Sequence, residues 1–334
     1  MGGTIDTRSE ATCTLQGRIL RIEKSSMYDG AGLRSVVFFK GCPMQCAWCS
    51  TPESQRFEVE IGFDLSKCTG CGTCAKACPQ GALTFDETPS VRHDLCKGCF
   101  VCAEVCQRRA IKKYGETIGA TEIVKEVSKD EVFYFHSGGG VTLSGGEPCA
   151  QPDFAAELLR ELKKRGIHTS VETALCVPRE NLDALLPYLD CVLADVKHMN
   201  SAHHKIWAGI DNSFILDNIR RLDSSDFPVS LIMRVPLIPG VNDDDENLKA
   251  VAGFGRELKK KLQAIELLPY HRLGSHTYEM LGRPYLLEST AVSPWEHVEE
   301  RAEYLSSCDP CVPVFTGNKQ IINPDSNSKT GGRR

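Results

Sequence analysis

The chain has 334 residues, of which 41% are apolar, and a formal net charge of −5. A chain of this length can bury a large core and can hold one large domain together with a small one. No apolar run approaches the roughly 18 residues of a membrane helix, the first residues lack the pattern of a signal peptide, and the scattered Lys and Arg form no basic stripe, so we expect a cytoplasmic globular protein that binds neither membrane nor nucleic acid.

The chain contains 17 cysteines, and eleven of them fall into three tightly spaced arrays. Disulfide scaffolds belong mainly to short secreted chains, whereas clustered cysteines in a chain of this size without a predicted leader are typical of metal ligands. We therefore expect the arrays to bind metal in a reducing compartment.

The first array follows the first predicted core strand. Residues 14–40 alternate apolar and polar side chains and end in an apolar run at 35–39, which predicts a hairpin or lead-in strand and then a core strand. Cys42, Cys46 and Cys49 come directly after this run. A [4Fe-4S] cubane normally takes four cysteine ligands, so three thiolates leave one iron open, and an open position is where a metal centre does chemistry. Structural zinc fits less well, because it takes four protein ligands.

This array resembles the signature of radical S-adenosylmethionine enzymes. Its spacing is Cys-x3-Cys-x2-Cys, and the aromatic Trp48 precedes the last cysteine. Upstream, Asp29–Arg34 reads Asp-Gly-Ala-Gly-Leu-Arg, which resembles an element of the activating enzymes for glycyl radical enzymes. The resemblance implies that the amino and carboxylate groups of S-adenosylmethionine chelate the open iron.

An internal repeat lies further along the chain. A Cys-x2-Cys-x2-Cys-x3-Cys run that starts at Cys68 recurs 28 residues later at Cys96, and this pattern resembles a bacterial two-cluster ferredoxin. In that arrangement the fourth cysteine of each run ligates the other cluster. The resemblance implies one cubane on Cys68, Cys71, Cys74 and Cys106, and a second on Cys78, Cys96, Cys99 and Cys102.

We predict that residues 60–114 form a ferredoxin-like domain inserted into a larger domain of residues 15–59 and 115–310, with a polar tail at 318–334. Some fifty residues bury too little apolar surface to fold alone, so metal would hold the insert together. Fully ligated clusters carry electrons, so the insert would relay electrons to the three-cysteine site or shield it. A purely structural role is the alternative.

A glycine-rich turn follows the insert. Thr121–Val132 predicts a helix and Val141–Leu143 a strand, and Gly145, Gly146 and Glu147 lie at the end of this strand. Glycines allow a ligand to approach the backbone closely. The sequence here also matches the Gly-Gly-Glu-Pro element of the family, whose backbone and carboxylate receive the methionine ammonium group.

The remaining residues alternate between predicted helices and strands. Helices are predicted at 152–165, 178–189, 212–222, 243–262 and 294–305, and strands at 168–173, 191–197, 230–236 and 264–268. The alternation predicts an α/β fold with a parallel sheet, and the strands at 36–39 and 141–143 bring the core to six strands. Radical S-adenosylmethionine enzymes of this type are similar, since they form a partial (β/α)6 barrel. Barrel sites lie at the carboxyl ends of the strands.

The resemblance assigns further cofactor contacts. Asp195–Val196–Lys197 matches the Asp-x-Lys of the family, which holds the carboxylate and ribose region of the cofactor, and the outer two side chains face one side of a strand. Arg234, in the stretch Arg-Val-Pro-Leu-Ile-Pro-Gly, matches an arginine close to the cofactor, and His271 matches a histidine that contacts the nucleoside. A structural role is the alternative for Arg234 and His271.

Two further pairs are singled out. Glu172–Thr173 matches an acidic–Thr pair near a monovalent cation, although the family more often has Asp at the first position. His203 and His204, by contrast, are predicted to be solvated residues at a helix end.

The motifs together resemble glycyl radical enzyme activating enzymes over residues 15–290. Such an enzyme takes an electron from flavodoxin or ferredoxin, works anaerobically, and cleaves S-adenosylmethionine into methionine and a 5′-deoxyadenosyl radical, which takes a hydrogen from a glycine Cα of a partner enzyme. No side chain is assigned a role as acid, base or nucleophile. Residues 49–55 resemble the activators of isethionate or related sulfonate lyases. The alternatives are a radical S-adenosylmethionine enzyme that acts on a small molecule and a multi-cluster electron carrier.

Overall fold

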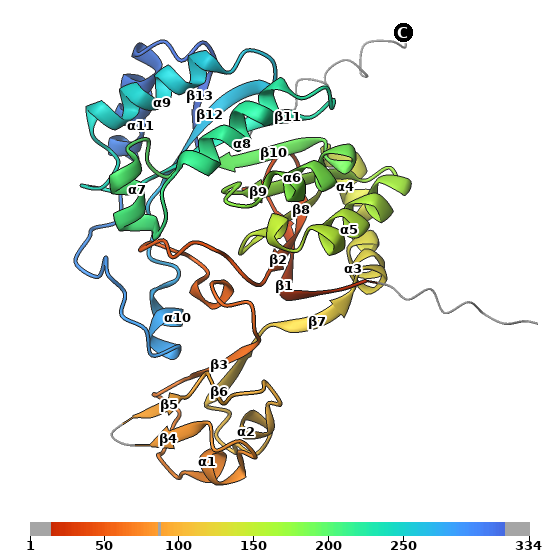
Figure 1. Ribbon diagram of the computed structural model, residues 1–334, viewed down its shortest axis with the longest axis vertical. Coiled ribbons are helices and arrows are strands. Elements are labelled where there is room, and N and C mark those ends of the chain that lie inside the picture. Colours follow the sequence, from red (N-terminus) through yellow and green to blue (C-terminus); the bar gives the residue numbers. More distant parts are fainter. Residues whose placement is uncertain (1–14, 86–87, 318–334) are drawn as a thin grey trace, which may run out of the picture.

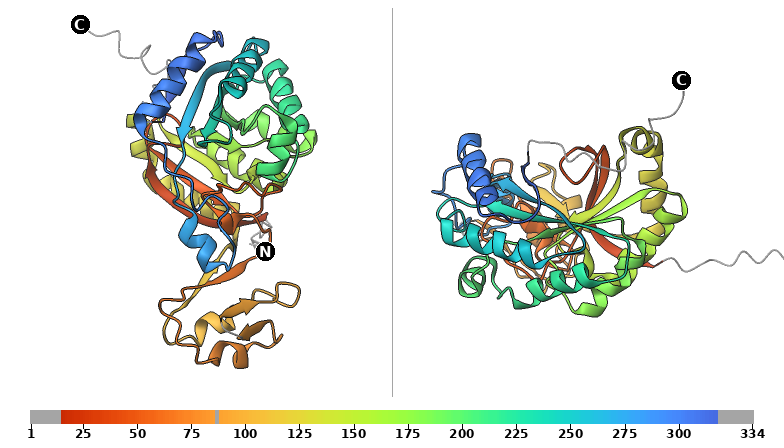
Figure 2. Two further views of the ribbon diagram at one scale, coloured as in Figure 1. Left: turned by 90° about the vertical axis from the view of Figure 1, so that its left-hand side faces the viewer. Right: turned by 90° about the horizontal axis from the view of Figure 1, so that it is seen from above.

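A parallel sheet forms the centre of the protein in the computed structural model, which describes residues 15–85 and 88–317. Six parallel strands lie side by side in chain order: β2 (Arg34–Phe39), β8 (Gly140–Gly145), β9 (His168–Thr173), β10 (Cys191–Asp195), β11 (Ser230–Leu237) and β12 (Leu262–Pro269). The predicted α/β class and its six core strands are therefore confirmed. Helices cover the outside of the curved sheet (Figure 2), so most of the strand residues are buried, as expected for a parallel sheet.

Three more strands extend the sheet to nine. The predicted lead-in strand is β1 (Gln16–Ser26), which pairs antiparallel with both β2 and β7 (Glu116–Gly119). At the other edge, β13 (Val314–Thr316) runs parallel to β12. The short strands β7 and β13 are not among the predicted strands, because three or four residues give too little periodicity to recognise.

The helices follow the strands in the order expected of β/α units. They are α3 (Ala120–Val127), α4 (Glu131–Ser137), α5 (Pro152–Lys164), α6 (Arg179–Leu185), α7 (Ser201–Ala208), α8 (Ser213–Ser224), α9 (Asp245–Glu257), α10 (Ser275–Met280) and α11 (Trp295–Ser307). The amphipathic helix α5 buries Leu158, Leu159 and Leu162 completely against the sheet. Within the described ranges, no helix combines the length and the apolar content needed to cross a bilayer.

The predicted helix at Thr121–Val132 is wrong in one respect. The chain forms α3, a 3-10 turn at Ser128–Asp130, and then the separate helix α4. The tighter turn changes the phase of the side chains, so Val132 is 65% exposed while Tyr134 is buried and donates a hydrogen bond to the carbonyl of Val127 at 2.9 Å.

The inner face of the sheet is polar as well as apolar. Arg34 is fully buried, and its guanidinium donates to the hydroxyl of Thr142 at 2.6 Å and to that of Ser170 at 3.0 Å. Burial lowers the pKa of Arg34 to about 10. The arginine of the predicted Asp-Gly-Ala-Gly-Leu-Arg element therefore ties the first three core strands together inside the barrel.

Residues 60–114 form a small lobe at one end of the molecule (Figure 1). It contains a two-stranded sheet of β3 (Glu60–Phe63) and β6 (Ile111–Tyr114), a hairpin of β4 (Leu83–Phe85) and β5 (Pro89–Val91), and the short helices α1 (Thr73–Ala77) and α2 (Val101–Glu104). Among the described residues of the lobe, the buried hydrophobic cluster has six members: Ile61, Phe63, Cys74, Leu83, Cys102 and Ile111. So small a core fits a lobe that depends on bound metal.

A buried ionic network joins this lobe to the barrel. The ammonium group of Lys40, directly after β2, contacts the carboxylate of Glu60 at 3.1 Å and the carbonyl of Glu53 at 2.6 Å. The other oxygen of Glu60 accepts from Arg283 at 2.6 Å. The side chains of Lys40 and Glu60 are both essentially inaccessible to water, and burial lowers the pKa of Lys40.

We expect Lys40→Met to destabilise the protein. Removal of one partner from a buried ion pair costs about 3–5 kcal/mol, and we expect about 3 kcal/mol because Arg283 still pairs with Glu60. At about 2–4 °C per kcal/mol, the midpoint of thermal unfolding should fall by roughly 6–12 °C. Circular dichroism of the reconstituted protein measures this shift. The matched control is Lys24→Met. Lys24 pairs with Glu126 on the surface, so this substitution should change the midpoint of thermal unfolding very little. Equal shifts for both variants would contradict the role of the buried network.

Candidate iron–sulfur and cofactor site

The three predicted ligands Cys42, Cys46 and Cys49 lie in an irregular loop after β2. Cys46 is buried and the other two thiols are partly buried. The loop is held from outside by helix α7, whose carbonyls at Ala208 and Trp207 accept hydrogen bonds from the backbone of the loop at 2.9 Å each. These carbonyls belong to the last turn of α7, where a helix leaves its carbonyls without internal partners.

The three cysteines of this loop are the residue type that ligates an iron–sulfur cluster. Burial raises the pKa of the Cys46 thiol to about 12, although Lys197 opposes the effect, and burial also raises the pKa of Cys49. Metal ligation requires the thiolate, so binding of iron would remove a proton from each thiol and stabilise the loop. In the described residues, no group of three or more His, Cys, Asp or Glu side chains is arranged so that it could hold a single metal ion. A cubane differs from such a site, because each thiolate binds a different iron.

The glycine pair Gly145–Gly146 packs against the start of the cysteine loop. A Cβ atom on Gly146 would lie 2.3 Å from the carbonyl oxygen of Gly41, and one on Gly145 would lie 2.7 Å from the backbone nitrogen of Phe39. Gly145 also has a φ of +95°, which side chains disfavour. The glycines therefore allow the turn at 145–146 to pack closely against the backbone of residues 39–41. The sequence predicted close approach of a ligand and not this contact within the protein.

Glu147 ties this turn to the end of β9. Its buried carboxylate accepts hydrogen bonds from the hydroxyl of Thr173 at 2.6 Å, from the amide of Ala174 at 3.0 Å and from the amide of Cys149 at 3.1 Å. The structure thus brings two of the predicted residues, Glu147 and Thr173, into direct contact. Because protein donors already surround the carboxylate, Glu147 is suited to hold the loops in place.

Arg234 lies between two acidic side chains inside the barrel. Its guanidinium contacts Glu266 at 2.8 Å and Glu172 at 2.9 Å, and it donates to the carbonyl of Tyr28 at 2.6 Å. The remaining oxygen of Glu172 accepts from Ser144 at 2.5 Å. Burial opposes ionisation of Glu172, but Arg234, Ser144 and Lys197 together outweigh it, so the pKa of that carboxyl is lowered. Five segments distant in sequence therefore meet in one hydrogen-bonded and charged network.

Asp195 and Lys197 form an ion pair of 2.8 Å at the carboxyl end of β10. Burial alone would lower the pKa of Lys197, but the carboxylate of Asp195, through its charge and its hydrogen bond, together with the nearby cysteines, raises that pKa. A cation is thus poised beside the cysteine loop. Between the two side chains, the amide of Val196 donates to the carbonyl of Arg234 at 2.8 Å, which fixes β10 against β11.

The two remaining predicted residues, Trp48 and His271, have different surroundings. Trp48 is buried in the main hydrophobic core, so its role is consistent with anchoring the cysteine loop. His271 is exposed beyond the end of β12, and its Nδ1 accepts from the amide of Leu273 at 3.4 Å.

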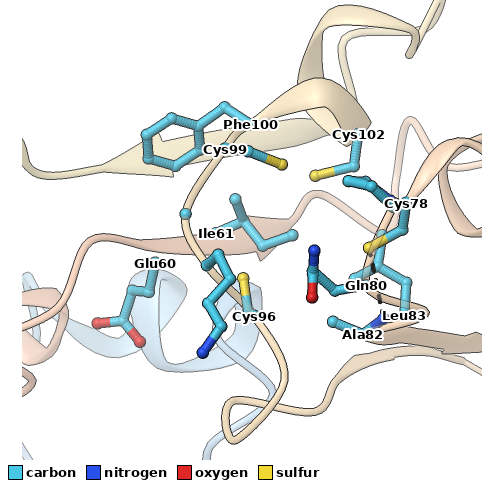
Figure 3. Close-up of a pocket in the computed structure, with 13 residues that line it drawn as sticks. Glu60, Ile61, Cys78, Gln80, Ala82, Leu83, Cys96, Cys99, Phe100 and Cys102 are labelled. Carbon is cyan, nitrogen blue, oxygen red and sulfur yellow. Dashed lines mark hydrogen bonds between the residues drawn. The ribbon is translucent and has the colours of Figure 1, made fainter.

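The cysteines of the small lobe gather in two sets. Cys78, Cys96, Cys99 and Cys102 line one small cavity, and Figure 3 shows their sulfur atoms around a common space beside Ile61. The cavity thus combines Cys78 of the first run with three cysteines of the second. In the other set, Cys74 lies close enough to Cys68 and Cys106 to be influenced by them electrostatically.

Hydrogen bonds to sulfur follow the internal repeat. The amide of Ala82 donates to the sulfur of Cys78 at 3.3 Å, and the amide of Ala110 donates to that of Cys106 at 3.3 Å. These positions are related by the displacement of 28 residues. Such bonds are among the factors that tune the potential of an iron–sulfur cluster.

Three residues near the site were missed or misjudged. The hydroxyl of Tyr278 donates to the carbonyl of Cys46 at 3.3 Å, a contact across 232 residues that no local pattern reveals. The buried amide of Asn242 donates to the carbonyl of Lys197 at 2.7 Å, and Asn242 stands beside the matched arginine stretch. The prediction that His204 is solvated is wrong, because its ring is buried in α7 and contacts the carbonyl of Ile210 at 2.6 Å.

Comparison with known proteins first gives the class. The family model described as the radical SAM superfamily matches residues 94–251, and the one described as a 4Fe-4S binding domain matches residues 61–84. The protein is therefore a radical S-adenosylmethionine enzyme with [4Fe-4S] ligation. The first match begins after the three-cysteine loop, so the geometry of that loop is separate evidence.

The relatives narrow the class to a family. The chain is 42% identical over 274 residues to the isethionate sulfite-lyase activating enzyme of Nitratidesulfovibrio vulgaris, covering 80% of this chain and 88% of the relative. It is 44% identical to the (2S)-3-sulfopropanediol sulfolyase activating enzyme of Bilophila wadsworthia, covering 81% and 91%. It is 38% identical to the (2S)-3-sulfopropanediol dehydratase activating enzyme of Klebsiella oxytoca, covering 87% and 94%. The chain therefore belongs to the family of glycyl radical enzyme activating enzymes.

Among solved structures, a domain of a pyruvate-formate lyase-activating enzyme from Bacteroides vulgatus aligns with 53% of this chain and 98% of that domain, at 31% identity and a TM-score of 0.44.

We expect Glu147→Gln to weaken the binding of S-adenosylmethionine. The carboxylate of Glu147 accepts hydrogen bonds from three donors, whereas the amide of Gln would turn an NH2 group toward at least one of them. A buried polar group left without a hydrogen-bond partner costs about 1–3 kcal/mol. The affinity should fall by about tenfold or more, since 1.4 kcal/mol is a factor of ten. Equilibrium dialysis of the reconstituted protein with labelled cofactor measures the change. Glu161→Gln, on the outer surface of α5, is the matched control. Unchanged affinity in Glu147→Gln would contradict the positioning role.

Proposed function

We propose that this protein activates a glycyl radical enzyme from a site built around Cys42, Cys46 and Cys49. The observation that carries the proposal is a loop of three, rather than four, thiols, in which Cys42 is influenced electrostatically by Cys46 and Cys49, beside the charged pair Asp195–Lys197. When bound there, the cluster and S-adenosylmethionine supply a 5′-deoxyadenosyl radical that takes hydrogen from a glycine Cα of the partner.

The side chains of the chain itself bind, orient and exclude water. Lys197 provides a positive charge for a carboxylate near the cysteine loop, and Asp195 holds that ammonium group in place. Glu147 fixes the glycine turn against the end of β9. On the inner face of the sheet, Arg234 of β11 links β9 and β12 through its ion pairs with Glu172 and Glu266. None of these groups is placed to act as a nucleophile.

We further propose three [4Fe-4S] clusters. The arrays of three, four and four cysteines support this number, as does the cavity shared by Cys78, Cys96, Cys99 and Cys102. The two clusters of the lobe would carry electrons from flavodoxin or ferredoxin in an anaerobic cytoplasm, and neither membrane nor nucleic acid would be a partner.

A monovalent cation near Glu172 and Thr173 stays a prediction. The carboxylate of Glu172 accepts from Ser144 and Arg234, whereas the hydroxyl of Thr173 donates to Glu147. The two neighbouring side chains serve different networks, so a cation there would have to use backbone carbonyls or displace these bonds.

The partner that we propose is a carbon–sulfur lyase for a sulfonate. The relatives named for isethionate sulfite-lyase and sulfopropanediol sulfolyase have identities of 42–44%, whereas those named for dehydratase, decarboxylase and trimethylamine-lyase partners have 37–40%. The resemblance of residues 49–55 to the sulfonate lyase activators points the same way.

The number of clusters predicts the iron content. Anaerobically reconstituted protein should bind about twelve irons, four per cubane. Replacement of Cys42, Cys46 and Cys49 together by Ala should lower this to about eight and abolish S-adenosylmethionine cleavage, because the open iron is lost. Iron analysis and chromatography of 5′-deoxyadenosine measure both effects. The matched control is Cys149→Ala, a buried cysteine outside the arrays that should keep all twelve irons. Cleavage by the triple variant would refute the site.

The partner is tested by the glycyl radical itself. Mixed anaerobically with S-adenosylmethionine, a reductant and a panel of glycyl radical enzymes, the protein should produce the glycyl doublet in the electron paramagnetic resonance spectrum of a sulfonate lyase. A doublet in an alcohol dehydratase alone would refute the proposed partner and preserve the family. Modification of a small molecule without any doublet would favour the enzyme alternative, and the absence of cofactor cleavage would favour an electron carrier.

A further inference from the structure

The two-stranded sheet of the small lobe has one end at the barrel and one end away from it. Glu60 pairs with Tyr114 at the first end, and Phe63 pairs with Ile111 at the second. Glu60 contacts Lys40 and Arg283, and the hydroxyl of Tyr114 donates to the sulfur of Met280 at 3.4 Å. The pair Glu60–Tyr114 therefore lies at the barrel end of this sheet, and the pair Phe63–Ile111 lies at the end away from the barrel (Figure 1).

One cysteine set lies at the barrel end of this sheet. Its cavity is lined by Glu60 and Ile61 together with Cys78, Cys96, Cys99 and Cys102 (Figure 3). Gly98, between two of these cysteines, is so close to Val59 that a Cβ atom would lie 2.4 Å from the Val59 side chain. Val59 directly precedes β3, so the second run of cysteines packs where the lobe joins the barrel.

The other cysteine set lies at the far end. The amide of Cys68 donates to the carbonyl of Asp64 at 3.0 Å, and the amide of Asp64 donates to the carbonyl of Ala110 at 2.7 Å. The amide of Ala110 in turn contacts the sulfur of Cys106 at 3.3 Å. Asp64 follows the last residue of β3 and Ala110 precedes the first residue of β6, so this set is attached beyond the end of the sheet.

The barrel end is also tied to the three-cysteine loop. Glu60 borders the cavity of the nearer set and pairs with Lys40, which stands two residues before Cys42. Arg283 contacts the second oxygen of Glu60 and donates to the carbonyl of Pro52 at 2.7 Å, in the turn after Cys49. One buried network thus connects the nearer set with both sides of the cysteine loop.

We propose that electrons leave the small lobe from the Cys78, Cys96, Cys99 and Cys102 set, and that the Lys40–Glu60–Arg283 network holds this set against the three-cysteine loop. The inference rests on the proposed function and assigns different roles to two sets that the sequence repeat makes look equivalent. A low-potential reductant such as reduced flavodoxin loses one electron, and the three-cysteine site gains it. No covalent bond changes in the transfer.

Two matched variants test the assignment. Cys71 and Cys99 occupy the same position of the repeat, and both thiols are exposed. Each Cys→Ala variant is mixed with reduced flavodoxin, and rapid freeze-quench electron paramagnetic resonance follows reduction of the three-cysteine site. In Cys99→Ala the reduction should slow by about tenfold or more, equivalent to about 1.4 kcal/mol of activation free energy. Reduction of Cys99→Ala at the wild-type rate, whether or not Cys71→Ala is slowed, overturns the proposal.

A third variant retains every cysteine. Arg283→Gln should keep the full iron content and still slow reduction of the three-cysteine site, because Glu60 loses its second cationic partner. Arg220→Gln, which removes a surface arginine paired with Glu257, should not change the rate. Equal rates in both arginine variants would overturn the role of the network.

Photoreduction with deazaflavin separates failure of this inference from failure of the proposed function. Because photoreduction does not depend on the lobe, Cys99→Ala should cleave S-adenosylmethionine under it. If wild-type protein fails to cleave S-adenosylmethionine under photoreduction, the proposed function is wrong. The reduction kinetics of the variants still decide which cysteine set passes electrons to the three-cysteine site.

Discussion

The structure depends on holding an irregular loop of three cysteines in one conformation. This loop forms no helix or strand, and most of its backbone hydrogen bonds go to segments outside it. The amide of Gly41 donates to Ser54 at 2.7 Å, the amide of Glu147 donates to the carbonyl of Gly41 at 2.8 Å, and α7 accepts from the middle of the loop. A metal site gains precision when its ligands are fixed by surrounding contacts before the metal binds.

The same need explains the charged interior of the barrel. A carboxylate or guanidinium group removed from water is costly unless it is paired. Here Arg234 is shared between Glu172 and Glu266, and Lys197 is paired with Asp195. Glu172, Arg234 and Glu266 lie on β9, β11 and β12, so their ion pairs link three strands of the sheet. The barrel can therefore present charge to a cofactor from side chains that already have fixed positions.

Much of this arrangement follows from local sequence, and the rest does not. The six core strands were predictable because apolar runs bounded by turns mark strands buried on both faces, and the cysteine spacing marked all eleven ligand candidates. The break between α3 and α4 was not predictable, because the 3-10 turn at Ser128–Asp130 shifts the helical phase and contains no Gly or Pro that would mark the end of a helix. The contact between Tyr278 and Cys46, and that between Arg283 and Glu60, span more than 200 residues. Only the folded chain brings such pairs together.

The crossed arrangement of cysteines has a consequence for the stability of the small lobe. Cys78 belongs to the first run by sequence but lines the cavity of the second, and Cys106 belongs to the second run but lies with Cys68 and Cys74. Each half of the repeat thus contributes one cysteine to the set of the other, so neither set is drawn from one half alone. The buried cluster of the lobe includes Cys74 and Cys102, one from each run, which makes metal ligation and apolar packing parts of the same core. A lobe built in this way should fold as one cooperative unit, and its two ends can differ in function while remaining inseparable in stability.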